Sequence, residues 1–417
     1  MTEHKLQPVR GTKDIFGKDV LLFNKIVDIA KNTALNYGFN ELQTPIFEFS
    51  EIFERNLGES SDIVEKEVYK FLDRSQNYLT LRPEFTAAVV RAFLSNGELS
   101  QSLPQKFFSY GPIFRYDRPQ KGRQRQFHQI NFEIFGEDNE YCDAETIAMA
   151  NSILSRLNIV SQTELQINSL GCHKTKIRYE ESLKKYFLQF KNKLSDDSLK
   201  RLEKNPLRIL DSKDENDIEI SKDAPIISNF FSDESKKRFD NVLKILDSLE
   251  ISFQINNKLV RGLDYYTSTV FEFVINTQNA QNTVLAGGRY DNLVDKMSHK
   301  NCPAIGFAAG IERLAMLCNY SEDTLTKTSV IYVSDQQKNF SFKIAQDLRN
   351  NGLNVDFIVD ANFKKQMKKA GQMQSRFLII IGEDEINSHM ITIKDSKDSS
   401  ESKIHQDKIF EFISKRI

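Results

Sequence analysis

The sequence contains no tryptophan and only four cysteines, which are scattered over its 417 residues. They form no CxxC pair, and no histidine stands at zinc-finger spacing, so we expect neither a metal site nor a disulfide. Long apolar runs are also missing, because the longest, residues 377–381, is far shorter than a membrane span. The first ten residues are polar and lack the apolar stretch of a signal peptide. We therefore expect a cytoplasmic protein without a membrane partner.

An excess of charge of one sign is absent as well. The 57 basic and 58 acidic residues leave a net charge of −1, which argues against a uniformly basic protein that wraps nucleic acid. The sequence has no GxxxxGK[ST], no GxGxxG after a strand, no HExxH and no GxSxG. Walker, Rossmann and the commonest hydrolase sites are thereby excluded. Any phosphate recognition must rest on arginine, whose planar guanidinium binds phosphate through two parallel hydrogen bonds.

With 40% apolar and 28% charged residues, the chain has an ordinary globular composition, and its length predicts two or three domains. In the first 170 residues predicted strands outnumber crossover helices, which favours an antiparallel α+β sheet. Asp19 is the expected N-cap of the first helix, and Pro45 restricts the first strand to an edge or an interface. The expected elements are a helix over residues 19–37, strands over 41–48 and 78–84, a helix over 85–94, and a hairpin over 107–117 and 126–136.

The pattern becomes helical and highly charged between about residues 171 and 250, which predicts an inserted helical module. Strand patterns then return over residues 251–255, 267–275 and 304–308, and a helix is expected from Gly310. We expect a first domain over residues 1–325, with the insertion at about 171–250, and a second over residues 326–417.

The second domain has alternating strand and helix patterns, which predict a small α/β fold. A cluster of lysines could contact phosphates or be only solvated, and the sequence does not decide between these roles. The expected elements are strands over residues 330–333, 355–359 and 377–381, helices over 340–350 and 363–373, and a loop over the serine-rich residues 395–403; the lysines are Lys364, Lys365, Lys368 and Lys369.

The strongest local anomaly is the segment RYDRPQKGRQR at residues 115–125, with five cations and one carboxylate. Such a loop is attractive to polyanions, although a charge run is often only solvated. In the strand that follows, polar and apolar residues alternate, so one face is fixed in a core and the other presents polar groups on a rigid support. That face could meet solvent, but two phenylalanines on it favour a ligand-binding cleft. The polar residues are Gln129, Asn131 and Glu133, the apolar ones opposite are Ile130, Phe132 and Ile134, and the phenylalanines are Phe127 and Phe135.

Three further islands carry arginine beside glycine: LVRGLDYY at residues 259–266, AGGRY at 286–290 and GFAAGIER at 306–313. Glycine permits close backbone approach. Arg313 falls in the first turns of a predicted helix, where the helix dipole disfavours a cation. Either an anionic ligand or an ion pair with a carboxylate such as Glu312 would compensate it, and both remain open.

Together these motifs resemble those of the histidyl-tRNA synthetase family, which are class II aminoacyl-tRNA synthetases. The resemblance includes LRPE from residue 81, FRYDRPQKGRQRQFHQ from 114, QPVRGTKD from 7 and INSLGC from 167, and it spans nearly the whole chain in the family's order. It implies a class II antiparallel catalytic sheet with flanking helices, a helical insertion, a C-terminal α/β anticodon-binding domain and a homodimer.

The resemblance also implies roles for single residues. Arg115 is expected at the α-phosphate and the histidine carboxylate, and Arg261 is expected to be catalytic with it. Phe85 departs from the family's usual glycine, which raises the alternative that it packs in the core. The expected ATP contacts are Arg115, Arg123 and Arg313, and the expected histidine contacts are Glu84, Phe85, Thr86, Arg115, Gln129, Glu133, Arg261, Tyr265 and Tyr266.

The implied reaction joins histidine to the 3′ end of tRNA(His) in two steps. ATP and Mg²⁺ first give histidyl-adenylate and pyrophosphate, and transfer to the terminal ribose follows. The rival hypothesis is a non-catalytic, histidine-sensing regulatory paralogue of ATP phosphoribosyltransferase, which would need neither the ATP arginines nor an anticodon-binding domain. A generic RNA-binding scaffold would leave the polar strand face unexplained.

Overall fold

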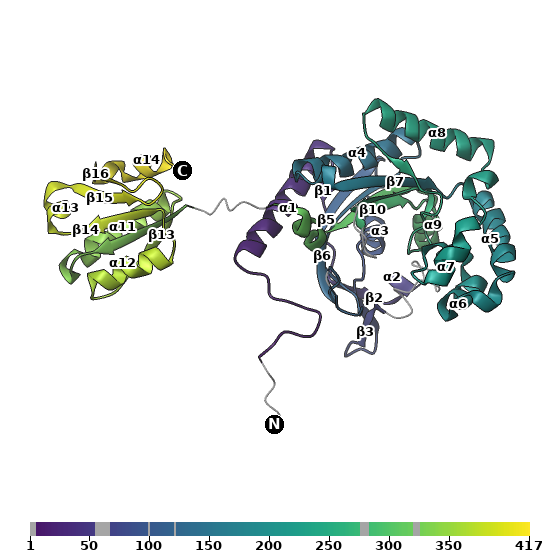
Figure 1. Ribbon diagram of the computed structural model, residues 1–417, viewed down its shortest axis with the longest axis horizontal. Helices are drawn as coiled ribbons and strands as arrows, with labels where there is room; N and C mark the ends of the chain where they lie inside the picture. The colour runs from purple at the N-terminus through teal and green to yellow at the C-terminus, as the bar shows by residue number, and fades with distance from the viewer. Residues whose placement is uncertain (1–5, 55–66, 99–100, 121, 276–282, 320–325) are drawn as a thin grey trace, which may run out of the picture. The chain divides into compact units, whose positions relative to one another are not determined.

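The computed structural model describes residues 6–54, 67–98, 101–120, 122–275, 283–319 and 326–417. The chain divides into two compact units, Met1–Asn319 and Tyr320–Ile417. Buried apolar clusters fill each unit separately. Each unit is therefore described by itself (Figure 1).

The first unit is built on an eight-stranded sheet in the order β1-β5-β6-β11-β10-β9-β7-β8. Its six central strands are antiparallel, whereas the edge strands β1 and β8 pair in parallel with β5 and β7. This is the predicted antiparallel sheet of an α+β fold. The strands are β1 (Asn40–Glu41), β5 (Gln105–Phe114), β6 (Gln126–Phe135), β7 (Thr163–Ser169), β8 (Gln254–Ile255), β9 (Thr267–Ile275), β10 (Thr283–Arg289) and β11 (Ala304–Gly310).

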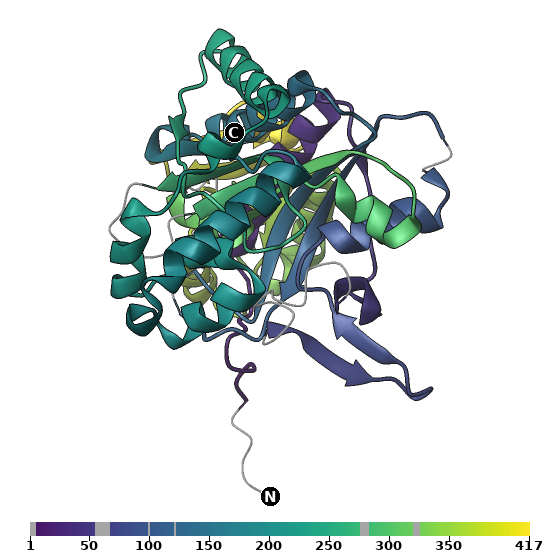
Figure 2. The same cartoon turned by 90° about the vertical axis from the view of Figure 1, so that its right-hand side faces the viewer.

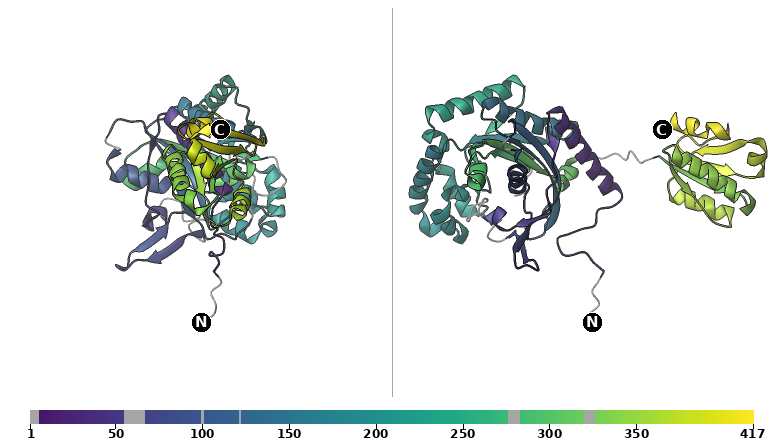
Figure 3. Two further views of the ribbon diagram at one scale, coloured as in Figure 1. Left: turned by 90° about the vertical axis from the view of Figure 1, so that its left-hand side faces the viewer. Right: turned by 180° about the vertical axis from the view of Figure 1, so that it is seen from behind.

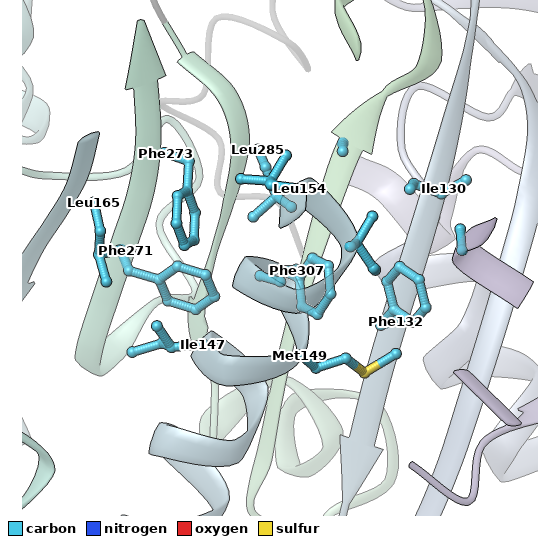
Figure 4. Close-up of a cluster of buried hydrophobic side chains, with 14 of the residues drawn as sticks. Ile130, Phe132, Ile147, Met149, Leu154, Leu165, Phe271, Phe273, Leu285 and Phe307 are labelled. Atoms are coloured by element: carbon cyan, nitrogen blue, oxygen red, sulfur yellow. The ribbon is translucent and has the colours of Figure 1, made fainter. Parts of the chain in front are cut away.

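One face of this sheet is covered by four helices over an apolar core. Figure 4 shows Met149 and Ile147 of a covering helix beside Phe132, Phe307 and Phe271 of the strands. The rings of Phe132 and Phe307 stack with their centroids 4.5 Å apart. These contacts fix the strand faces, so the alternate residues of each strand must point to the opposite side. The helices are α1 (Lys18–Asn36), α4 (Glu140–Arg156), α8 (Asp233–Ser248) and α10 (Ile311–Leu317).

The opposite face carries a second core and the helical module that follows β7. In Figure 3 the teal helices of this module bend around one side of the sheet. The helices of the module on this face are α5 (His173–Leu188), α6 (Asp196–Lys204) and α7 (Glu215–Ile220), and the second core also includes α3 (Thr86–Ser95) and α9 (Asn292–Ser298).

A three-stranded sheet in the order β2-β4-β3 projects from this unit (Figure 2). It corrects the prediction of one strand over residues 41–48, because that stretch is divided between β1 of the large sheet and β2 of the small one. Pro45 lies at the break, and its carbonyl and that of Thr44 accept hydrogen bonds from the buried Arg82 guanidinium. The elements are β2 (Phe47–Phe49), α2 (Glu51–Glu54), β3 (Tyr69–Leu72) and β4 (Tyr78–Leu81).

The predicted N-cap of the first helix was wrong as well. Gly17 is the N-cap of α1, with φ of 60°. Asp19 lies in the first turn, where its carboxylate interacts favourably with the positive end of the helix dipole. The hairpin predicted over residues 107–117 and 126–136 is confirmed by ten paired positions of β5 and β6. The sequence interpretation did not assign strands to β7 and β10.

The second unit is a five-stranded sheet in the order β13-β12-β14-β15-β16, with parallel and antiparallel pairs. The loop predicted over residues 395–403 was wrong, because Asp395 pairs with Ser400 across a hairpin. The Asp395 carboxylate accepts from the backbone N–H of Lys397 at 3.0 Å and stabilises the turn. The elements are β12 (Lys327–Tyr332), α11 (Lys338–Asn350), β13 (Asn354–Phe357), α12 (Phe363–Gln372), β14 (Phe377–Ile381), α13 (Glu383–Ser388), β15 (Met390–Asp395), β16 (Ser400–His405) and α14 (Ile409–Ser414).

In the part of the chain that the structure describes, no helix combines the length and the apolar character that crossing a membrane requires.

Candidate active site

The site is built on the face of β6 opposite the apolar core. Ile130, Phe132 and Ile134 are buried in that core, so their neighbours Gln129 and Asn131 are directed to the other side. Both line a cavity of about 320 Å³. The polar strand face therefore forms a cleft, as the phenylalanines on it predicted.

Ten of the eleven predicted site residues line this one cavity, although they come from separate parts of the chain. The exception is Glu133, which is 1% exposed and lies behind the cavity wall. Its carboxylate accepts hydrogen bonds from two residues that do line the cavity, Thr86 at 2.6 Å and Asn131 at 2.9 Å. The ten are Glu84, Phe85, Thr86, Arg115, Arg123, Gln129, Arg261, Tyr265, Tyr266 and Arg313.

Three arginines that line the cavity, Arg115, Arg123 and Arg313, lie near enough for their charges to interact. Nε of Arg115 donates to the Pro83 carbonyl at 2.8 Å, and Nη1 of Arg313 donates to the Thr283 carbonyl at 2.6 Å. Burial lowers the pKa of Arg313, and the neighbouring charges of Arg123 and Arg115 lower it further. The pKa of Arg115 is lowered by burial too, with Arg123 acting in the same direction. Like charges held together in a partly buried site favour an anionic ligand.

Arg261 lies in the same cavity with a different set of partners. It forms an ion pair with Glu272, and its guanidinium lies 5.4 Å from the centroid of the Tyr266 ring. Burial lowers the pKa of Arg261, but the Glu272 carboxylate raises it, and the pKa lies above its ordinary value. Its Nε is buried and has no hydrogen-bond partner among the described residues. A buried N–H group without a hydrogen-bond acceptor costs free energy, so this atom is suited to donate to an oxygen of a ligand.

Two tyrosines and a carboxyl group also line the cavity, near Arg115. Glu84 is buried and accepts from the backbone N–H of Ala87 at 2.9 Å in the first turn of α3. Burial raises its pKa. The rings of Tyr265 and Tyr266 lie with centroids 4.7 Å apart. Oδ1 of Asn131 is a buried acceptor without a partner among the described residues. These groups offer hydrogen-bond donors and acceptors to a small polar ligand.

Tyr290 is a residue that sequence reasoning did not place in the site. Its hydroxyl donates to the Glu133 carboxylate. The contact exists because β11 pairs with both β6 and β10, which brings together residues 157 positions apart. The only available signal was its position in the AGGRY island. Gly306, paired with Glu133, leaves room for the carboxylate, which a Cβ at that position would overlap.

Burial raises the pKa of Glu133 to about 7 from 4.5, against the lowering effect of the hydrogen bonds from Thr86, Tyr290 and Asn131. The folded state therefore binds more protons at this carboxyl than the unfolded state does between about pH 4.5 and about pH 7. We expect the free energy of unfolding to fall as the pH rises through this window, by up to about 3 kcal/mol from this group.

Urea unfolding of the wild type and of Glu133→Gln at pH 5 and pH 7.5 measures this contribution. The wild type should lose stability relative to the variant at the higher pH. An equal difference between the two proteins at both pH values would show that Glu133 does not titrate in this window.

Side-chain contacts bear on two questions that the sequence left open. Glu312 accepts from the backbone N–H of His128 at 3.0 Å and lies against its ring Nδ1, so it is not the hydrogen-bonded partner of Arg313. Phe85 packs in the second core with 1% exposure, under the Arg82 guanidinium at 4.2 Å. It also borders the cavity, where it supplies an apolar wall.

Two further ion pairs support the site. Glu272, which sequence reasoning missed, accepts from the Thr283 hydroxyl at 2.8 Å and pairs with Arg261. Arg289, the arginine of the AGGRY island, is fully buried and pairs with Asp143 behind the sheet. Arg289 therefore fixes β10 to α4 and does not reach a ligand.

The comparisons with known proteins agree with this architecture. The profile of the family described as "Histidyl-tRNA synthetase" matches residues 11–314, and that described as "Anticodon binding domain" matches residues 327–416. A curated "Histidine--tRNA ligase" of Rickettsia bellii is 45% identical over 99% of each chain. Another of that name, from Wolbachia pipientis of Culex pipiens, is 47% identical over 98% of this chain and 99% of its own.

Among solved structures, the apo histidyl-tRNA synthetase of S. aureus superimposes with a TM-score of 0.81 at 32% identity, over 98% of this chain and 99% of that one. A protein titled "ATP phosphoribosyltransferase regulatory subunit/histidyl-tRNA synthetase" from Bacillus halodurans has a TM-score of 0.65 at 21% identity, over 90% of this chain and 98% of its own. That second likeness shows the fold alone.

The antiparallel sheet with its flanking helices and the separate anticodon-binding unit define a class II aminoacyl-tRNA synthetase. Within that class, the chain belongs to the histidyl-tRNA synthetase family.

Proposed function

We propose that this protein is a histidine–tRNA ligase, which activates L-histidine with ATP and transfers it to the 3′ end of tRNA(His). The observation that carries the proposal is the meeting of four arginines on one cavity, beside a polar pocket on β6. Family membership over nearly the full length supports it.

For the first step, we assign the arginines to the charge that develops on phosphate oxygens. The histidine carboxylate attacks the α-phosphorus in line, and pyrophosphate leaves. Arg115 holds the α-phosphate and the carboxylate, while Arg123 and Arg313 hold the outer phosphates, with Arg313 also against adenine. Arg261 donates from its Nε, which has no other partner among the described residues, to the oxygens at the reacting phosphorus. Positioning of the two substrates does most of the work.

For histidine selection, we assign polar groups of the same cavity. Glu84, Thr86, Gln129 and the two tyrosines of LVRGLDYY are the proposed contacts of the amine and the imidazole. Glu133 holds Thr86 and Asn131 in place from behind the wall. A smaller amino acid would leave these groups buried without partners, at roughly 1.5–3 kcal/mol for each charged hydrogen bond lost.

Mg²⁺ is proposed as the ion that accompanies ATP. Within the described ranges there is no group of three or more His, Cys, Asp or Glu side chains arranged to hold a metal. Mg²⁺ is commonly bound through one or two carboxylates plus substrate phosphates, so a dedicated cage is not required. Glu272, which lines the cavity beside Arg261, is the carboxylate we assign to it. Bound there, the ion would neutralise phosphate charge.

We divide the chain into a catalytic domain over residues 1–325, with its helical insertion at about 171–250, and an anticodon-binding domain over residues 326–417. The second compact unit and the anticodon-binding profile support this division. In that domain Lys364, Lys365 and Lys368 are exposed on α12 and available to RNA phosphates, whereas Lys369 pairs with Asp360 at 3.0 Å. Since tRNA and ATP are cytoplasmic substrates, we place the enzyme in the cytoplasm.

We propose that the enzyme is a homodimer, and that the small sheet β2-β4-β3 takes part in the interface. This sheet exposes large apolar side chains, which on a protein surface often mark an interaction site. Light scattering should therefore give the mass of two chains, and the mass of one would refute the proposal. The exposed residues are Phe47, Phe49, Phe71, Leu72 and Tyr78.

The regulatory paralogue remains the second candidate, but the observations favour the enzyme. A histidine sensor has no need of Arg123 and Arg313, and these line one cavity together with Arg115. Charging of a tRNA(His) transcript with labelled histidine tests the choice. We expect charging that depends on ATP and fails with a tRNA of another identity, whereas a protein that binds histidine without charging tRNA would be the paralogue.

A further inference from the structure

The motif QPVRGTKD has no role in the site described above, although its glycine lies against the cationic loop of residues 115–125. Residues 6–17 form the dark violet thread that precedes α1 (Figure 1). The Gly11 carbonyl accepts from the backbone N–H of Arg125 at 2.6 Å. Arg125 is the last residue of the loop, so the N-terminal segment is joined to the loop at its base.

The approach of the two segments is too close for any side chain at position 11. A Cβ on Gly11 would lie 2.8 Å from Cγ of Arg125 and 3.0 Å from Cγ of Pro119. Gly11 has φ of +86°, in the left-handed region. Pro119 and Arg125 belong to the outgoing and the returning arms of the loop. One glycine therefore packs against both arms.

A turn holds this glycine in place. The backbone N–H and the hydroxyl of Thr12 both donate to the Val9 carbonyl, at 2.9 and 2.7 Å. The turn thus presents the Gly11 carbonyl to Arg125 in one orientation.

The base of the loop determines where its arginines lie. The Arg125 carbonyl accepts from the Arg115 N–H at 2.9 Å, and the Arg125 guanidinium lies 4.0 Å from the centroid of the Tyr116 ring. Nε of Arg125 donates to the Asp117 carbonyl at 3.3 Å, and the Asp117 carboxylate binds Arg123 at 2.9 Å. A chain of contacts therefore runs from Gly11 through Arg125 to Arg123, and Arg123 lines the cavity.

We propose that the N-terminal turn around Gly11 is a positioning element for the cationic loop, and that Gly11 sets the placement of Arg123 toward the ATP phosphates. The proposal rests on the function proposed above for the cavity. Gly11 acts through Arg125 and touches no substrate. Its effect should fall on ATP more than on histidine, because the side-chain contacts of Arg125 lead through Asp117 to Arg123, which is assigned to ATP alone.

Pyrophosphate exchange by the full-length chain tests this with Gly11→Ala and Gly17→Ala. Gly17 is a matched control, because it has φ of +60° in the same N-terminal segment but nothing within 4 Å of a Cβ. Both variants place alanine at a residue with positive φ, and only Gly11→Ala also forces a Cβ against neighbouring side chains. Gly11→Ala should raise the KM for ATP about fivefold or more, with the KM for histidine changed less than about twofold. Gly17→Ala should leave both values near those of the wild type.

Thr12→Val provides a second variant that keeps the size of the side chain and removes only its hydroxyl bond to Val9. It should raise the KM for ATP by about twofold without affecting that for histidine. Equal behaviour of Gly11→Ala and Gly17→Ala would overturn the proposal. So would a parallel rise of both KM values in Gly11→Ala.

Limited trypsin digestion separates this proposal from the proposed function, since it needs no activity. Cleavage after Arg123 should be faster in Gly11→Ala than in Gly17→Ala. Unchanged cleavage would contradict the positioning role, whereas a wild type without histidine-dependent exchange would contradict the function and not the anchoring of the loop.

Discussion

Arg261→Ala should lower histidine-dependent ATP–pyrophosphate exchange roughly tenfold or more. The reason is that Arg261 offers a buried Nε without a partner among the described residues, on a cavity that it shares with the arginines proposed to bind phosphate. A donor that meets charge as it develops contributes mainly to the transition state, so kcat should fall more than substrate affinity. Steady-state exchange at varied ATP and histidine measures both.

A control must show that loss of an ion pair alone does not produce the effect. Arg376 offers a match in the second unit, because it pairs with Asp395 at 3.1 Å and is 22% exposed, against 18% for Arg261. Arg376→Ala should leave exchange unchanged, since the first step requires no tRNA. Exchange by Arg261→Ala at the wild-type rate would remove Arg261 from the mechanism, while Arg261→Lys should recover part of the activity because it keeps the charge.

Glu133→Ala should weaken histidine binding by roughly tenfold to a hundredfold, with a much smaller change in ATP binding. Glu133 accepts from Thr86, Asn131 and Tyr290, so its removal frees three donors in and behind the wall proposed to bind histidine. Calorimetric titration with each substrate gives the two affinities.

Two milder variants separate charge from packing in the same experiment. Glu133→Gln keeps the volume and removes the charge, and Tyr290→Phe removes one donor to the carboxylate. Both should weaken histidine binding less than Glu133→Ala does. If any of these variants weakened ATP binding more than histidine binding, the assignment of Glu133 and its partners to histidine binding would be contradicted.

The sequence predicted the elements whose patterns are local. The hairpin of β5 and β6 was predicted because apolar and polar residues alternate along β6, and β9 and β14 occupy the predicted ranges. β16 was missed because its alternation is between half-buried and exposed polar residues, which a hydrophobic pattern does not register. The break between β1 and β2 depends on Arg82, which is distant in sequence and donates hydrogen bonds to the carbonyls of Thr44 and Pro45.

The same distinction applies to the candidate site. The arginines were predicted from motifs. Their meeting in one cavity depends on the order of the strands in the sheet, which local sequence patterns do not reveal. Tyr290 and Gly11 were quoted in motifs but received no role, because their partners Glu133 and Arg125 are more than one hundred positions away in each case. Glu133 was predicted to face the substrate, whereas in the structure it lies behind Thr86 and Asn131, which line the cavity.

The central claim is that these convergent arginines activate histidine and no other amino acid. Pyrophosphate exchange measured with each of the twenty amino acids supplied separately tests it most directly. The account predicts strong exchange with histidine and background rates with the other nineteen. Exchange with a different amino acid, or background rates with histidine as well, would contradict it.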